Sequence, residues 1–270
     1  MMKATEIRSC YIGPQISPEQ FITEHFFLYL ITGSITAYDG DKEYKIRAGD
    51  YGIVRRNHLV KYNKKPNDDK KFEKVVIIFD QEFLKTFNRQ YKYETVNPKS
   101  KNAIIRLNNN YLVENFIQSL NPYFNNNGTI NPDFSNIKRS ELLLILLNNN
   151  PELANIFFDF GIPEKIDIEA FMNKNYKFNT SIERFAYLTG RSLSAFKRDF
   201  EKVFNDTPSH WLVQKRLQEA HFLIEKKDKK PSDIYLDLGF EDLSHFSFAF
   251  KKLFGHTPKD LTERKKKISS

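Results

Sequence analysis

The chain has 270 residues and a formal net charge of +8, from 42 lysines and arginines against 34 aspartates and glutamates. Its one cysteine, Cys10, excludes an internal disulfide and is typical of a reducing compartment, and the longest aliphatic run, residues 142–147, is far too short to cross a bilayer. We therefore expect a cytoplasmic protein with no membrane segment. Its basic surplus favours a polyanionic partner, either nucleic acid or an anionic membrane surface, unless the lysines only solubilise its surface.

The first 80 residues predict closely spaced β-strands. Apolar or alternating runs read, in chain order, "HFFLYLI", "SITAY", "EYKI", "RAGDYGIV" and "FEKVVIIF". The segment "DGDK" predicts a hairpin turn after "SITAY", and "KKPNDDKK" predicts a polar loop before "FEKVVIIF". Short strands joined by short turns are typical of a small β-barrel or sandwich, and they predict one here.

Residues 81–160 change to a helical pattern. Helical spacing appears in "QEFLKTFNRQY", around "NYLVENFIQSL" and through the long apolar segment of residues 133–160. The aliphatic face at residues 142–147 exceeds what one amphipathic surface helix needs, so it either packs on the barrel or forms a dimer interface, or does both.

A domain boundary is predicted near Gly161 and Pro163, between residues 1–162 and residues 163–270. The basic surplus is concentrated beyond it. Residues 1–164 carry 21 basic and 19 acidic side chains, whereas residues 165–270 carry 21 basic and 15 acidic ones. The second half is therefore where we expect a polyanion to bind.

The second half also contains an internal repeat. "FNDTP" at residues 204–208 and "FGHTP" at residues 254–258 lie 50 residues apart, and the same offset relates Phe196 to Phe246 and Phe200 to Phe250. Each unit has a short helix, a glycine turn at Gly190 or near Gly239, and a second helix with a phenylalanine stripe. This spacing predicts two helix-turn-helix units.

The face opposite each phenylalanine stripe carries short polar and long basic side chains, as a helix that enters a DNA groove requires. In the first unit Ser192 is the expected N-cap of this helix. The exposed face of the first unit is expected to present Ser194, Lys197, Arg198, Glu201 and Lys202, and that of the second Ser244, His245, Phe248, Lys251 and Lys252.

One longer helix is predicted between the two units, over residues 207–227. Thr207 is its expected N-cap and Pro208 its first residue. This helix would hold the two units at a fixed separation, and we place Lys215 and Arg216 on it near DNA.

These segments resemble the AraC/XylS-type transcription regulators. "RFAYLTGRSLSAFKRDFEKVFNDTP" resembles the first helix-turn-helix of the family, "KRLQEAHFLI" its connecting helix and "IYLDLGFEDLSHFSFAFKKLFGHTP" its second unit, roughly over residues 180–261. The resemblance implies a bacterial activator or repressor that binds double-stranded DNA through two adjacent major-groove segments and contacts RNA polymerase. It assigns base contacts to Ser194, Lys197 and Arg198 in the first unit and to Ser244, His245, Ser247 and Phe248 in the second.

Two positions depart from the family pattern. Tyr235 replaces a small alanine, so the first helix of the second unit must pack differently, and Phe248 stands where arginine is common. The N-terminal strands resemble the cupin-type sensor barrel of the family. This resemblance implies a sensor domain whose effector is a small molecule or a protein, and it transfers no ligand-binding residue. The predicted elements together give an α+β protein, and the aliphatic face at residues 142–147 makes a homodimer the expected assembly.

The alternative function is a cupin-like metalloenzyme with an accessory nucleic-acid-binding domain. A metal site needs clustered ligands, but this half has only His25 and His58, with no H-x-H, and we expect both to make polar contacts in the barrel. The chain also lacks a P-loop, G-x-S-x-G and H-E-x-x-H. We therefore expect no enzyme, no metal and no cofactor. A third hypothesis keeps the DNA-binding half and makes the barrel a docking module for a regulatory protein.

Overall fold

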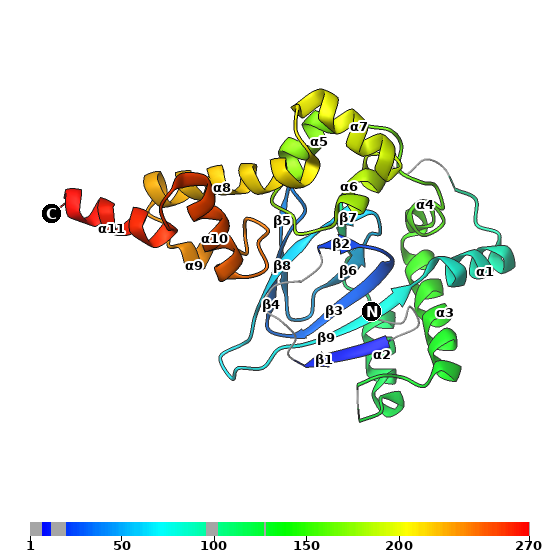
Figure 1. Cartoon of the computed structure of the whole chain (residues 1–270). Coiled ribbons are helices and arrows are strands. Elements are labelled where there is room, and N and C mark those ends of the chain that lie inside the picture. Colours follow the sequence, from blue (N-terminus) through cyan, green and yellow to red (C-terminus); the bar gives the residue numbers. More distant parts are fainter. Residues whose placement is uncertain (1–6, 12–19, 96–101, 127, 270) are drawn as a thin grey trace. The chain divides into compact units, whose positions relative to one another are not determined.

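The computed structural model describes residues 7–11, 20–95, 102–126 and 128–269, and these fall into two compact units (Figure 1). Unit 1 takes residues 7–11 and Phe21–Gly161, and unit 2 takes Gln20 and residues 162–269. A β-rich N-terminal domain with helices is therefore followed by an all-α domain, as the sequence predicts. No helix in the described part of the chain is long and apolar enough to span a membrane.

The strands of unit 1 form three antiparallel sheets. A five-stranded sheet has the order β1-β9-β3-β6-β10, a three-stranded sheet has the order β5-β4-β8, and β2 pairs with β7. The strands are β1 (Ile7–Tyr11), β2 (Phe21–Ile22), β3 (His25–Thr32), β4 (Ser34–Tyr38), β5 (Glu43–Arg47), β6 (Tyr51–Val54), β7 (His58–Leu59), β8 (Lys61–Lys65), β9 (Glu73–Phe79) and β10 (Ile104–Arg106).

The predicted barrel is wrong in one respect, because the sheets do not close. In the described residues, β1 and β10 each pair with one neighbour in the five-stranded sheet, and β5 and β8 each pair with one in the smaller sheet. A closed barrel needs every strand paired on both sides. The chain leaves the large sheet at Gly33, which has φ +92° and lies so close to Lys65 that a Cβ would come within 2.8 Å of its carbonyl oxygen. The result is two larger sheets with open edges that pack on each other, beside the small β2–β7 sheet.

Local turn predictions are confirmed, with one boundary shifted. In the β4–β5 hairpin the Asp39 carboxylate accepts hydrogen bonds from the backbone N–H groups of Asp41 and Lys42, at 3.0 and 2.8 Å. The segment predicted as a loop before β9 begins later than expected, because Lys64 and Lys65 pair with β4. Lys64 is buried, and its ammonium lies over the rings of Tyr62 and Phe72 at 5.4 Å from each centroid.

The five-stranded sheet is the middle layer of unit 1. Because side chains alternate along a strand, Leu28 and Leu30 of β3 face the three-stranded sheet while Phe27 faces the helices. The helical layer consists of α1 (Gln81–Tyr91), α2 (Tyr111–Ser119), the 3-10 helix η1 (Asn121–Tyr123), α3 (Pro132–Asn149), the 3-10 helix η2 (Pro151–Leu153) and α4 (Ala154–Phe157).

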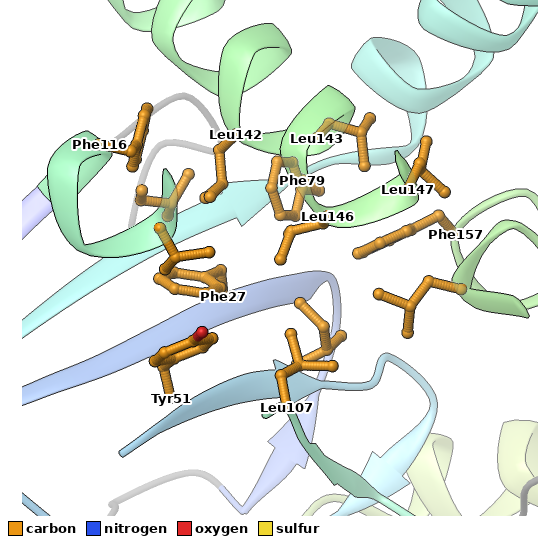
Figure 2. Packing of buried hydrophobic residues seen from close by; sticks show 14 of the residues in the cluster. Phe27, Tyr51, Phe79, Leu107, Phe116, Leu142, Leu143, Leu146, Leu147 and Phe157 are labelled. Carbon is orange, nitrogen blue, oxygen red and sulfur yellow. The ribbon is translucent and has the colours of Figure 1, made fainter. Parts of the chain in front are cut away.

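The aliphatic run of α3 packs inward. Leu142, Leu143, Leu146 and Leu147 are at most 2% exposed and lie among Phe27, Phe79 and Phe157, as Figure 2 shows. Of the two explanations for this run, packing on the sheet is confirmed. The outward side of α3 instead exposes Phe134 and Ile137.

Unit 2 contains the predicted repeat. Its helices are α5 (Ile168–Asn175), α6 (Ile182–Leu188), α7 (Leu193–Phe204), α8 (Pro208–Lys227), α9 (Pro231–Ile234), α10 (Leu243–Phe254) and α11 (Pro258–Ser269). The long helix α8 begins at Pro208, and the hydroxyl of Thr207 caps it by accepting from the His210 N–H. The predicted connecting helix is therefore confirmed at both of its ends.

Candidate nucleic-acid interface

Helices α7 and α10 are built in the same way. Each follows a glycine in the left-handed region, Gly190 with φ +68° and Gly239 with φ +84°. The Ser192 hydroxyl accepts from the Ala195 N–H at 3.3 Å, and the Asp242 carboxylate accepts from the His245 N–H at 2.6 Å, so each helix has a side-chain N-cap.

The C-terminal ends of the two helices match as well. The C-cap residue of α7 is Asn205, with φ +51°, and that of α10 is Gly255, with φ +78°. The two residues lie 50 positions apart. Both residues end their helix in the left-handed backbone conformation, which glycine and asparagine adopt most readily.

The two phenylalanine stripes are buried as predicted. Phe196, Phe200, Phe246 and Phe250 are fully buried, and Phe204 and Phe254 are half-buried. In the first unit Phe200 and Phe204 pack against Trp211 of α8, at ring-centroid distances of 5.6 and 4.6 Å. Burial of one face of each helix leaves the opposite face to solvent.

The outer face of α7 is exposed and mostly basic. Ser194, Lys197, Arg198 and Lys202 are all exposed, as is Glu201. Asp199, on the flank, accepts from Arg191 Nε at 3.1 Å, and this hydrogen bond lowers the pKa of the Asp199 carboxyl. The Arg198 guanidinium lies 3.5 Å from Asp199, yet 68% of its side chain is exposed. The sequence repeat does not reveal the Arg191–Asp199 pair, because the equivalent positions of the second unit are Glu241 and Ala249.

The outer face of α10 is exposed at five of the six predicted positions. Ser244, His245, Phe248, Lys251 and Lys252 are exposed, whereas Ser247 is half-buried. Phe248 is 72% exposed, and the His245 ring lies 5.9 Å from the buried ring of Phe240. This face therefore combines an apolar ring, short polar groups and two lysines.

The placement of Arg216 on a DNA-binding surface is a prediction that the structure corrects. Arg216 is buried and donates to three backbone carbonyls, so its guanidinium does not point to solvent. The Lys215 ammonium lies over the rings of Trp211 and Tyr176, at 5.8 and 6.0 Å from their centroids. Arg216 therefore belongs to the interior of unit 2, whereas Lys215 is half-buried and its placement near DNA stays a prediction.

The departure at Tyr235 has a structural consequence. The first helix of the second unit, α9, has four residues against seven in α6, and Tyr235 ends it. The half-buried Tyr235 packs against the buried cluster formed by Leu217, Phe246 and their neighbours. The first helix of the second unit thus differs from its counterpart in the first unit, which agrees with the different packing expected from the departure at Tyr235.

The two histidines considered as metal ligands lie in unit 1 and contact Arg56. His25 is buried, and its Nδ1 accepts from the Arg56 N–H at 3.3 Å. Burial, followed by the charges of Arg56 and Arg55, holds the pKa of His25 well below its usual value. His58 Nδ1 lies 2.8 Å from the Arg56 carbonyl oxygen. No group of three or more metal-ligating side chains gathers within the described ranges.

A cavity of about 210 Å³ lies between the two larger sheets of unit 1. Its wall includes Leu28, Tyr44, Ile46, Val54 and Ile104. Charged side chains of both signs also line it, and Arg106 pairs with Asp50 among them. These residues are Glu43, Lys45, Asp50 and Arg106. Tyr44 lines this cavity, whereas Phe27 points to the helices instead.

Comparison with known proteins matches both units. A family model described as the ExsA N-terminal regulatory domain matches residues 25–156, and one described as a helix-turn-helix domain matches residues 185–264. The HTH-type transcriptional regulator ExsA of Pseudomonas aeruginosa is 23% identical over 255 residues, which are 94% of this chain and 91% of that protein.

Two further matches differ in extent. The virulence regulon transcriptional activator VirF of Yersinia enterocolitica is 31% identical over 91 residues, 34% of each chain. A crystal structure of an apo ToxT variant from Vibrio cholerae matches 95% of this chain and 96% of that chain, with 13% identity and a TM-score of 0.46.

Proposed function

Because the chain belongs to the AraC/XylS family of transcription regulators, with an ExsA-like N-terminal regulatory domain and a C-terminal helix-turn-helix domain, we propose that α7 and α10 read two successive major-groove segments of one operator. The chain is a DNA-binding transcription regulator and not an enzyme. The metalloenzyme alternative is therefore set aside.

One observation carries the proposal for the site. Two helices related by a 50-residue offset bury equivalent phenylalanines and expose the opposite faces, and those faces carry the basic and short polar side chains that DNA contacts use. In this assignment Arg198 and Lys197 contact guanine or phosphate, and Lys202, Lys251 and Lys252 contact phosphate. The remaining contacts to base edges come from Ser194, Ser244, His245, Ser247 and Phe248.

The two domains have separate roles in this proposal. Residues 163–270 bind DNA, and residues 1–162 sense an effector and hold two copies together through the outward side of α3. ExsA is named as a transcriptional regulator and VirF as a transcriptional activator. By analogy this chain activates transcription in the bacterial cytoplasm and contacts RNA polymerase, which run-off transcription with and without the purified protein tests. Unchanged transcript yield on its operator contradicts activation.

The cavity between the sheets is the proposed place for a small effector. Its lining combines apolar and charged side chains, a combination that fits a small molecule with an apolar body and a polar end. The competing hypothesis, an N-terminal domain that docks a regulatory protein, places the partner on the surface of the domain instead of in the cavity. A calorimetric titration with candidate ligands distinguishes the two hypotheses.

The DNA-binding proposal is tested with the intact chain. Sequences are selected from a random pool, and affinity for the selected site is measured over a salt series. Arg198→Ala should weaken binding by about 1–3 kcal/mol and relax preference at one base pair if Arg198 reads guanine. Lys252→Ala should instead weaken binding to all sequences and reduce the salt slope by about 0.9.

Lys226 supplies the matched control, because it is an exposed lysine of α8 that pairs with Glu225 at 3.4 Å and lies outside both recognition helices. Lys226→Ala should leave affinity and salt slope near the wild-type values. If the wild-type chain enriches no sequence, the proposed function is wrong.

A further inference from the structure

Arg216 occupies the middle of α8, and its guanidinium is buried with three acceptors around it. Its Nε donates to the Tyr176 carbonyl oxygen at 2.7 Å, Nη2 to the Phe178 carbonyl at 2.8 Å, and Nη1 to the Gly239 carbonyl at 2.9 Å. Arg216 is 8% exposed and forms no ion pair within the described residues. Burial lowers the pKa of Arg216 to about 10, so the group remains charged at neutral pH.

The three acceptors belong to different halves of unit 2. Tyr176 and Phe178 lie in the segment that follows α5 and leads into α6 of the first helix-turn-helix, whereas Gly239 lies in the turn that precedes α10 of the second. The side chains of α8 before and after Arg216 pack against different helix-turn-helix units. Trp211 packs with Phe200 of the first unit, and Leu217 belongs to the cluster around Phe246 of the second.

The contact between Arg216 and Gly239 leaves no room for a side chain at position 239. A Cβ at this position would lie 2.8 Å from Arg216 Cζ and 3.0 Å from the Lys177 carbonyl oxygen. Gly239 also has φ +84°, which favours glycine independently of the space. Only a residue without a Cβ therefore allows the turn of the second unit to lie this close to the Arg216 guanidinium.

Two contacts nearer the surface join the same segments. Lys177 Nζ lies 2.7 Å from Glu219 Oε1 of α8, and Asn179 Nδ2 donates to Glu241 Oε1 at 3.2 Å. Residues 176–179 are thus linked to α8 and to the start of the second unit. Arg216 is the buried member of this group, and its planar fork can satisfy three carbonyls whose directions are fixed.

We propose that Arg216 is a positioning residue that locks the two helix-turn-helix units at one separation and angle, and so fixes the operator spacing that the chain accepts. This inference rests on the proposed function. A long helix alone can bend or let the units rotate about their side-chain contacts, whereas three directed hydrogen bonds from one rigid group restrain both units at once.

The consequence on DNA is geometric. One inserted base pair moves the second segment by about 3.4 Å and rotates it by roughly 35°. A locked pair of recognition helices then engages one segment but loses the other. A loosened pair recovers both contacts at the altered spacing, and it binds the parent site less tightly because ordering the units costs entropy.

The first test measures the lock without DNA. Cys10→Ser removes the only cysteine, and Glu201→Cys on α7 with Lys252→Cys on α10 provides two exposed sites for spin labels. The inter-label distance distribution should be narrow with Arg216 and broader or shifted with Arg216→Met. Arg216→Lys, which keeps the charge and loses the fork, should be intermediate. This readout does not depend on whether the chain recognises a sequence.

The second test measures spacing with the intact chain on its selected site and on a copy with one base pair inserted between the segments. The wild type should lose at least about tenfold in affinity on insertion, and Arg216→Met less than about threefold. The control, Lys215→Met, removes the neighbouring charge and should keep the wild-type ratio. Circular dichroism verifies folding, and Arg216→Lys serves for the same comparison if Arg216→Met does not fold.

Unchanged distance distributions and an unchanged affinity ratio in the Arg216 variants overturn the inference while leaving the proposed function intact. A wild-type chain that selects no DNA sequence refutes the proposed function instead. In that case the distance measurement still shows whether Arg216 fixes the two units.

Discussion

Phe248 and Phe250 stand two positions apart on α10, yet one is 72% exposed and the other is fully buried. Helical geometry predicts this difference, because two residues along a helix differ by about 200° in direction. The other phenylalanines of the segment have structural roles, with Phe240, Phe246 and Phe250 buried and Phe254 half-buried. Phe248 is thus the one that packing within the described part of the chain leaves to solvent.

Phe248→Ala should weaken binding to the selected operator by on the order of 1 kcal/mol without destabilising the fold, because an exposed ring contributes little to the core. The apolar target in a major groove is the C5-methyl group of thymine. The loss should therefore disappear on an operator in which the matching thymine is replaced by uracil. Gel-shift titrations on the two operators provide the comparison, and equal losses on both exclude the methyl contact.

Two arginines of unit 2 differ in their environment and in their proposed roles. Arg198 exposes most of its side chain, whereas Arg216 is buried among carbonyl oxygens. In the sequence both arginines lie in predicted helices with several basic residues, and such a helix predicts a DNA contact for each of them. Only the approach of Gly239 and of residues 176–178, which are distant in sequence, gives Arg216 its acceptors.

At the scale of the element, α3 is apolar on two sides. Its inner leucines pack on the large sheet, while Phe134 is 46% and Ile137 64% exposed on the outer side. Tyr123 lies against Phe134 at a ring-centroid distance of 5.2 Å and is also partly exposed. An exposed apolar side next to a well-packed inner side is typical of a surface that another protein covers, and a second copy of the chain is the partner proposed for it.

Ile137→Arg should produce monomers and weaken binding to paired half-sites, because the added charge would be buried in the dimer without a partner. Leu146→Ala is the contrasting variant, since Leu146 is 1% exposed in the core. It should lower the free energy of unfolding by about 2–5 kcal/mol and leave self-association unchanged. Sedimentation velocity and urea unfolding separate the two effects. A wild-type chain that is monomeric at micromolar concentration, with and without DNA, contradicts the dimer.

At the scale of the whole molecule, each unit has a hydrophobic core of its own. Phe27, Phe79 and Phe157 lie in the core of unit 1, and Phe246 and Phe250 lie in a core of unit 2. The cavity belongs to unit 1 and the recognition helices belong to unit 2. An effector that binds this cavity would change DNA binding only through coupling between the units.

An effector that binds the cavity should change the operator affinity of the intact chain and leave that of a fragment of residues 162–270 unchanged. Ile46→Phe adds volume at the wall of the cavity and should weaken effector binding. Its operator affinity without effector should stay near the wild-type value. Fluorescence anisotropy with labelled operator measures both effects. A fragment that responds to the same compound places the effector site in unit 2 and contradicts this assignment.

The sequence by itself determined the repeated helices, their caps and the sides that they bury. These features follow from residues a few positions apart, such as Phe196 and Phe200 or Thr207 and Pro208, so local periodicity is enough to predict them. The strands of residues 25–79 were predictable for the same reason, because alternation and turn residues act locally.

The tertiary structure alone decided which surfaces meet. The pairing of β1 with β9 and of β4 with β8 leaves two open sheets where a barrel was predicted, and strand order depends on contacts between distant segments. The inward direction of Leu142–Leu147 needed the large sheet as a partner, and the burial of Arg216 needed the carbonyl oxygens of Tyr176, Phe178 and Gly239. Local sequence fixes the type of an element and the side it can bury, but the free energy of packing distant surfaces selects what that side contacts.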